Sequence, residues 1–478
     1  MNPATAGSEA PERAGTRSLD SIIIALGAGT VLGLILIAQG RTKDNQFTHP
    51  MHSPNDRSRF ATIRALGDNG TYAIGRIDDD GKPVAGSIIA EDGWDTIDKV
   101  RRPDNGLIYS SKPPLLPTVL AGEYWLLKTM TGERLTFAKH PQALVRAIVV
   151  TSNWVPLVIF LTLFSRMLFR VTGDVWVRTF TLAAAVGGTY LSGFSVTLNN
   201  HTVAAFFAFF ALYPTILIWL DDRRDWWLFA IAGFFAAFTA VLELPALALA
   251  AALFAGLAWK DLNKSLLCFV PFALIPLAAH CYTNYQVTGS LRPAYDNKNW
   301  YEFKGSYWKI DPESGRLVGG SNDPKSIDSQ HEPPYVYIFH MLLGHHGVFS
   351  LSPIFVLSAI GLARVLAKSE SSWKPLAILT VGLTVLLVAF YTFAPEFGMG
   401  QRNYGGRCNG MRWLFWLIPL WLVFLPEGLE WKAGCRGYRC LALVLLLISA
   451  ASAFYASRNP WTNPWLHELL NQAGWLQY

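Results

Sequence analysis

Charged residues are scarce in this chain, which argues against a water-soluble protein. They account for 15% of the 478 residues, whereas hydrophobic residues account for 51%. Soluble domains usually carry about 25% charged residues. Charge is absent altogether from several windows, namely 21–37, 182–194, 202–220 and 376–393. At 1.5 Å per residue the longer windows can cross a hydrocarbon core of ~30 Å, so they indicate membrane-spanning helices.

Cysteine is also rare, and the common nucleotide-binding motifs are missing. The 5 cysteines form no C-x-x-C pair, and no histidine lies beside them at the spacing of zinc ligands. Neither a disulfide framework nor a cysteine-based metal site is therefore expected. The sequence contains no G-x-x-x-x-G-K-[ST] loop and no G-x-G-x-x-G element, which leaves an ATP-driven pump without support. The net charge of +6 comes from Lys and Arg residues spread over the chain, which excludes a nucleic-acid-binding patch.

Long apolar segments dominate what is present. They predict an all-α polytopic membrane protein with about 11 transmembrane helices, and the 18 tryptophans suit a chain with many membrane interfaces. One further apolar segment, 116–130, carries Glu123 and Lys128, which favours a helix that lies along the membrane surface. The predicted spans are 21–38, 145–169, 175–196, 202–220, 226–242, 244–257, 265–282, 349–366, 375–393, 413–425 and 441–456.

The basic residues predict the orientation of these spans. Cytoplasmic loops are enriched in Lys and Arg, and a cytoplasmic N-terminus puts basic residues into every short cytoplasmic segment. Those residues are Arg13, Arg17, Arg166, Arg170, Arg178, Arg223, Arg224, Lys260, Lys264, Arg364, Lys368, Lys374, Lys432, Arg436 and Arg439. The predicted organisation is a disordered cytoplasmic tail (1–18), an N-terminal transmembrane module (19–283) with a large external loop (39–115) and the interfacial helix (116–130), a second large external loop (284–348), C-terminal transmembrane helices (349–456) and an external tail (457–478).

The first external loop contains two segments that could carry chemistry. From Asp56 the run 56–66 has the pattern of a short amphipathic helix, and a carboxylate at its start would act as a cap. The loop ends in Ser111-Lys112-Pro113-Pro114-Leu115, where Pro113 disfavours helical geometry at Lys112. A fixed lysine just outside the membrane could bind a lipid phosphate. The alternative is an ordinary interfacial lysine whose amine reaches toward water.

Together these segments resemble the GT-C superfamily of membrane glycosyltransferases. The resemblance is closest to the bacterial aminoarabinose transferases that act on lipid A and to the protein O-mannosyltransferases. Those enzymes carry a D-E-x-R-Y-x-x-I-type motif early in the first external loop, and the matching run here is Asp56-Arg57-Ser58-Arg59-Phe60-Ala61-Thr62-Ile63. Their E-K-P-P-L-type motif corresponds to 111–115, and Tyr124-Trp125-Leu126 follows at the place of their interfacial helix. Arg57 departs from the family, which has an acidic residue there.

Two further features fall where the family has them. The polar break Leu198-Asn199-Asn200-His201 lies at the second external loop, where related enzymes often place an Asp, and Glu243 ends the fifth span. The resemblance covers residues 1–260 in order and spacing, and the C-terminal half is similar only in kind.

The resemblance implies an inverting glycosyltransferase. It would move a sugar from a polyprenyl-phosphate donor to an acceptor at the outer face of a bacterial inner membrane. Asp56 would be the catalytic base, because an acceptor hydroxyl is a poor nucleophile until its proton is taken. Lys112 and Arg59 would face the donor phosphate and neutralise the departing polyprenyl phosphate.

Later segments add candidate residues of less specific pattern. Arg402 and Arg407, in the glycine-containing loop 401–407, could reach a phosphate, with contact to lipid headgroups as the alternative. Substrate-binding candidates are Arg57, Asn200, His201, Glu243, Trp308 and Tyr404. The pair His345-His346 suggests a metal, but adjacent histidines point in different directions on a helix, so no metal site is predicted there, and the metal dependence of the reaction is left open. Membrane lipids and the lipid-linked donor are the predicted partners.

Two other functions are compatible with the sequence. A transporter or flippase of lipid-linked sugars would place ionisable residues inside the helix bundle, whereas here they gather at span ends and in external loops. A non-catalytic subunit could keep the GT-C fold without a working site, and the departure at Arg57 favours this alternative.

Overall fold

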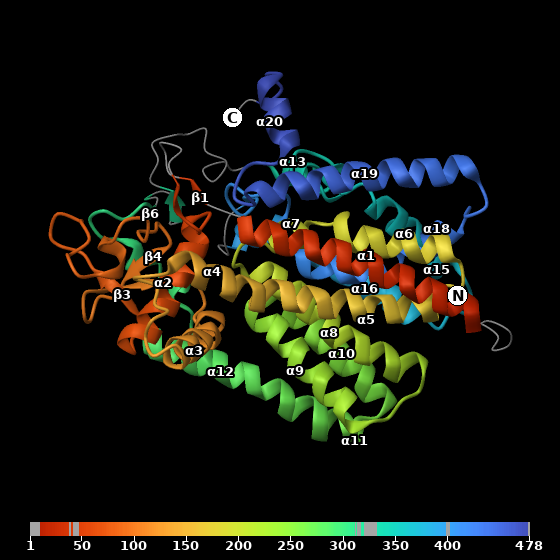
Figure 1. The fold of residues 1–478 in the computed structure, drawn as a ribbon, viewed down its shortest axis with the longest axis horizontal. Helices are drawn as coiled ribbons and strands as arrows, with labels where there is room; N and C mark the ends of the chain where they lie inside the picture. Colours follow the sequence, from red (N-terminus) through yellow and green to blue (C-terminus); the bar gives the residue numbers. More distant parts are fainter. Residues whose placement is uncertain are drawn as a thin grey trace.

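The chain is mostly helical, and its polar loops gather at one end of the long helices. The computed structural model describes residues 10–37, 40–41, 47–310, 312, 317–319, 332–397 and 402–476. In Figure 1 the long helices run roughly side by side across the view, with the loop strands and α2 and α3 at the left and the N-terminus at the right. The predicted tail 1–18 lies partly outside the described residues, and α1 (Ala10–Ile37) begins within it.

Six helical stretches are at least 18 residues long and apolar enough to cross a membrane, which supports an integral, polytopic membrane protein. They are Ser18–Ile37, Pro141–Val171, Asn200–Leu220, Leu262–Thr288, Lys374–Phe393 and Arg436–Arg458, and shorter apolar helices cover Trp226–Leu242, Leu244–Lys260, Phe355–Ala367 and Arg412–Val423. The helices that build the bundle are α1, α4 (Pro141–Val149), α5 (Val155–Val171), α6 (Val175–Gly187), α7 (Tyr190–Phe194), α8 (Asn200–Leu220), α9 (Trp226–Leu242), α10 (Leu247–Lys260), α11 (Leu262–Lys264), α12 (Val270–Thr288), α15 (Phe355–Ala367), α16 (Lys374–Phe393), α17 (Ile418–Val423), α18 (Leu425–Glu430) and α19 (Arg436–Arg458).

Three predicted spans are interrupted in the structure. The segment 175–196 divides into α6 and α7 at the pair Gly187-Gly188, since glycine weakens a helix interior. The segment 349–366 is divided near Pro353 into α14 (Val348–Leu351) and α15. The segment 413–425 starts as a 3₁₀ helix and continues as α17 and α18, whose second residues are prolines. Proline cannot donate a backbone hydrogen bond, so it favours the first turn of a new helix.

The two large loops form one layer because they contact each other. The first contains α2 (Pro54–Asn69) and an antiparallel sheet in the order β3-β5-β4, and the second contributes the hairpin β6-β7. Trp308 Nε1 donates a hydrogen bond to the Ile97 carbonyl at 3.1 Å, and Lys304 pairs with Asp80 at 2.9 Å. Contact between the loops requires that both lie on the same side of the bundle. The strands are β1 (Gly40–Arg41), β2 (Phe47–His49), β3 (Ala73–Arg76), β4 (Lys99–Arg101), β5 (Leu107–Ser110), β6 (Trp308–Ile310) and β7 (Leu317–Gly319).

Helix α3 (Leu115–Met130) coincides with the segment predicted to lie along the membrane surface. Its charged residues are paired with neighbouring elements: Lys128 contacts Asp68 of α2 at 3.0 Å, and Glu123 accepts a hydrogen bond from Thr151 at 2.7 Å. These contacts hold α3 at the loop end of the bundle (Figure 1). Its orientation relative to a bilayer stays a prediction. The remaining helices outside the bundle are α13 (Pro334–Leu342), α14 and α20 (Trp465–Gln472).

Helices α15 and α18 approach so closely that only glycine fits at their crossing. A Cβ added at Gly361 would overlap the carbonyl oxygen of Phe424, and one added at Gly428 would overlap that of Leu357. Small residues at such crossings let helix backbones touch, which is how membrane helices often associate. The pair Gly361 and Gly428 therefore fixes the packing of the C-terminal helices.

We expect Gly361→Ala and Gly428→Ala each to destabilise the protein by about 1–3 kcal/mol, because the added methyl group forces the two backbones apart. Thermal unfolding of the detergent-purified protein measures the effect. Gly382→Ala in α16 is the matched control, since a Cβ there meets nothing within 4 Å, and it should leave the melting temperature unchanged or slightly higher. Equal melting temperatures for all three variants would contradict the close crossing.

Candidate functional site

The site begins at the start of α2, where Asp56 closes a capping box. Ser53 is the N-cap, and its hydroxyl accepts from the backbone N–H of Asp56. Asp56 Oδ1 in turn accepts from the backbone N–H groups of Ser53 at 2.8 Å and Arg57 at 3.0 Å, while Oδ2 accepts from the backbone N–H of His52 at 2.8 Å. The Thr197 hydroxyl donates to Oδ2 at 2.9 Å. Asp56 therefore caps α2, as the sequence allowed, and its buried carboxylate is held by donors alone.

One turn further along α2, Arg59 connects the loop to the bundle. Its guanidinium donates to the Asn55 carbonyl at 3.0 Å and, through Nη2, to the Asn200 side chain at 2.5 Å. Asn200 lies at the start of α8, and its amide donates to Glu243 at 2.6 Å, just after the end of α9. His201 Nδ1 also contacts the Glu243 carboxylate. Four predicted site residues thus form one chain of buried polar contacts.

Lys112 reaches the same region from the end of the first loop. Its ammonium group pairs with Asp98 at 2.9 Å, and its side chain is 22% exposed. Burial lowers the pKa of Lys112, the Asp98 carboxylate opposes that shift, and the nearby Arg59 adds to it. Asp98 is itself held in place, because its carbonyl accepts from the Ser58 hydroxyl of α2 at 2.6 Å. The sequence analysis did not identify Asp98, since nothing in its local sequence marks it as a partner of Lys112.

A third cation, Arg412, comes from the C-terminal half and was also missed. Its Nη2 donates to the Gly405 carbonyl at 2.6 Å, and its guanidinium lies 4.8 Å from the centre of the Trp461 ring. Its buried Nε and Nη1 have no hydrogen-bond partner among the described residues. Arg412 acts electrostatically on both Arg59 and Lys112, so the three cations share one region.

The three residues Arg59, Lys112 and Arg412 form a cationic cluster whose electrostatics favour an anion. Burial lowers the pKa of Arg59 to about 10, and the neighbouring Asp98 counteracts this while Arg412 strengthens it. A guanidinium stays charged at such a pKa at neutral pH. The cluster can therefore bind a phosphate with charge-assisted hydrogen bonds.

The other predicted residues lie in different contacts. Arg57 points along the loop and donates to the carbonyls of Ser53 and Asp95, and Trp308 belongs to the contact between the two loops. Arg402 donates to the Glu332 carbonyl at 2.8 Å, and the Tyr404 hydroxyl contacts the Glu332 carboxylate. Arg407 is exposed. None of these contacts connects the five residues to the cationic cluster. They are Arg57, Trp308, Arg402, Tyr404 and Arg407.

The pair His345-His346 differs from the prediction in its backbone. The two histidines do not lie on a helix but in the turn between α13 and α14. Both are fully buried, and both rings lie against the Tyr404 ring, at centroid distances of 5.0 Å and 4.5 Å. Burial, followed by the neighbouring imidazoles, lowers the pKa of both histidines, so they are neutral at physiological pH.

Neither a scan of protein-family models nor a search of curated proteins returns a match for this chain.

Proposed function

We propose that this protein is an inverting glycosyltransferase with a GT-C-like architecture, which transfers a sugar from a polyprenyl-phosphate donor to an acceptor at the outer face of a membrane. The observation that carries the proposal is the cationic cluster beside Asp56, at the end of the helices where both polar loops meet. Four of the contributing residues come from the segments that resemble the family motifs or from the polar break at the start of α8: Asp56, Arg59, Lys112 and Asn200.

The donor phosphate would bind to the cationic cluster. Arg412 offers two buried nitrogens without a partner among the described residues, and Lys112 could exchange its Asp98 partner for a phosphate oxygen. Binding to cations favours the products of bond cleavage, because the polyprenyl phosphate gains negative charge at the oxygen that leaves the sugar.

Asp56 would act as the base. Its carboxylate is fixed in direction by backbone donors, and among the described residues the side-chain donor from outside the capping box is the Thr197 hydroxyl on Oδ2. An acceptor hydroxyl that replaces the Thr197 hydroxyl would donate to Asp56 Oδ2, and this oxygen could take its proton. Its oxygen then attacks the anomeric carbon as the bond to the phosphate breaks. A single displacement of this kind inverts the anomeric configuration.

The proposed setting is a bacterial inner membrane crossed by about 11 helices, with the N-terminus in the cytoplasm and both loops outside. The support for it is the basic-residue bias of the short loops together with the direct contact between the two large loops. Under this topology α3 lies along the outer surface.

We expect cysteines introduced in place of the native residue at 56, 112, 308 and 407 to lie outside, and those at Arg223 and Lys432 to lie inside, in a chain whose own 5 cysteines are replaced. Labelling of intact cells with a membrane-impermeant maleimide separates the two sets. Labelling at position 223 without permeabilisation would overturn the topology and, with it, the external site.

We expect Asp56→Asn to lower sugar transfer at least about 100-fold, because a positioned base typically contributes 10²–10⁴-fold. An Asn amide cannot accept at both positions where Asp56 accepts backbone N–H groups, so this variant also loses capping. Ser53→Ala is the matched control, since it weakens the same cap by about 0.5–2 kcal/mol but keeps the carboxylate. The assay follows labelled sugar from a polyprenyl-phosphate carrier at a temperature where melting curves show all proteins folded. Near-full transfer by Asp56→Asn would refute the assignment of the base.

Binding of polyprenyl phosphate tests the cationic cluster separately. We expect Lys112→Met and Arg412→Met each to weaken binding about 10- to 100-fold, since hydrogen bonds to charged groups contribute about 1.5–3 kcal/mol. Lys99→Met is the matched control: Lys99 lies in the same loop, but pairs with Asp95. Equal affinities for the Lys112 and Lys99 variants would argue against a phosphate site at the cluster.

Each of the two alternative functions is supported by one specific observation. The observation that bears on a transporter is the buried contact of Asp20 with Arg178 at 3.6 Å, which joins α1 to α6 near the start of each predicted span. A non-catalytic subunit is favoured by Arg57, because its side chain donates hydrogen bonds to two backbone carbonyls of the first loop. If the unmutated protein showed no sugar transfer, one of these two functions would become more plausible than a glycosyltransferase.

A further inference from the structure

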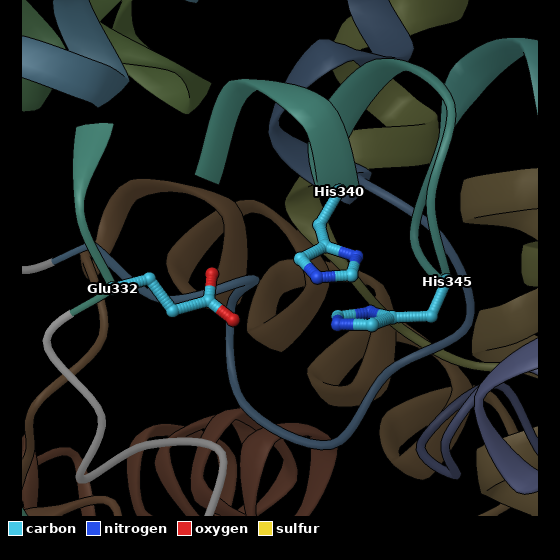
Figure 2. Close-up of side chains that lie close together, drawn as sticks. All are labelled: Glu332, His340 and His345. Atoms are coloured by element: carbon cyan, nitrogen blue, oxygen red, sulfur yellow. The ribbon is translucent and has the colours of Figure 1, made fainter. Parts of the chain in front are cut away.

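A second group of side chains has the composition of a metal site. Glu332, His340 and His345 each offer a ligand atom, and these atoms all lie within 4.8 Å of one another. Figure 2 shows the Glu332 carboxylate and the two imidazole rings turned toward the same space. Glu332 and His345 are buried, and His340 is partly buried. The residues come from the chain before α13, from α13 itself and from the turn after it.

The packing of these histidines suits metal binding. The rings of His340 and His345 stack with their centroids 3.9 Å apart, which places both imidazoles at the same site. The buried nitrogens Nδ1 of His340 and Nε2 of His346 have no hydrogen-bond partner among the described residues. A buried polar atom without a partner costs about 1–3 kcal/mol, so a cluster that only filled space would leave this cost uncompensated.

We propose that Glu332, His340 and His345 bind one divalent transition-metal ion, for which Zn²⁺ is the best match. Two imidazoles and a carboxylate are ligands that zinc accepts in four-coordinate sites, whereas Mg²⁺ and Ca²⁺ prefer oxygen alone. Zinc bonds of about 2.0–2.1 Å put tetrahedral ligand atoms roughly 3.4 Å apart. Small side-chain rotations bring atoms that lie within 4.8 Å to that spacing. Three protein ligands leave a fourth position for a water molecule, or for a nearby imidazole.

The surroundings supply the supporting contacts that metal ligands usually have. The Tyr404 hydroxyl contacts the Glu332 carboxylate, which would orient it toward the ion. His345 Nδ1 lies 2.5 Å from His346 Nδ1, and the His345 ring is 5.3 Å from that of His467 in α20. The site would therefore join the second loop, the Tyr404 loop and the C-terminal helix α20. This proposal does not depend on glycosyl transfer.

Metal content of the full-length, detergent-purified protein tests the proposal. After treatment with a chelator and dialysis against a slight excess of Zn²⁺, we expect mass spectrometry of the metal to find about one zinc ion per chain. Loading with Co²⁺ instead should give the visible absorption bands of a tetrahedral site. Glu332→Gln and His340→Gln should each lower zinc affinity at least 10-fold, and Tyr404→Phe should weaken it less, because it removes only a supporting contact.

His140→Gln is the matched control, since His140 is exposed at the start of α4, away from the cluster. It should retain zinc with unchanged affinity. The melting temperature of each protein is measured with and without Zn²⁺, so that a variant that folds but gains no stability from zinc is distinguished from one that is misfolded. The proposal would be overturned if the unmutated protein contained no zinc after loading. It would also be overturned if both Glu332→Gln and His340→Gln retained zinc fully.

Discussion

The close approach of three cations, the buried Arg59 and the partly buried Lys112 and Arg412, is the constraint on which the candidate site depends. Removing a cation from water is costly unless an anion or hydrogen-bond acceptors replace the lost hydration. Lys112 has Asp98 at 2.9 Å, whereas Arg59 relies on the oxygens of Asn55 and Asn200. Each partner belongs to a different element, so the cluster can form only where the start of α2, the end of the first loop and the start of α8 meet.

The capping box of α2 fixes the other half of the site. Because Asp56 accepts from backbone groups on both of its oxygens, its position is set by the course of the chain from His52 to Arg57 and not by a flexible side chain. Capping and catalysis are therefore not exclusive roles. The orientation of this carboxylate is fixed by its donors, and among its partners in the described residues a substrate could replace the Thr197 hydroxyl without unwinding α2.

The sequence predicted the parts of the fold and site that have local causes. The length of the apolar segments predicted most of the long helices. It could not predict the interruptions at Gly187-Gly188 and near Pro353, where the backbone preferences of glycine and proline end a helix although the sequence stays apolar. Family-like motifs predicted Asp56, Arg59 and Lys112, which the structure brings into one region. Asp98 and Arg412 have no local motif, and their importance comes only from tertiary contacts. At His345-His346 a helix was assumed where the chain makes a turn, because local sequence does not show how the chain folds between α13 and α14.

The loop that begins at Arg402 links the two sites physically. Tyr404 contacts Glu332 of the proposed metal site, and the carbonyl of the next residue, Gly405, accepts a hydrogen bond from Arg412 of the cationic cluster. Gly405 has φ 88°, and a Cβ there would lie 2.6 Å from Arg412 Nε, so no other residue allows this turn with the guanidinium in place. An ion that fixes Glu332 would also fix Tyr404, and through Gly405 it would limit where Arg412 can point. Metal binding and phosphate binding would then be coupled by one short stretch of backbone, without any shared ligand.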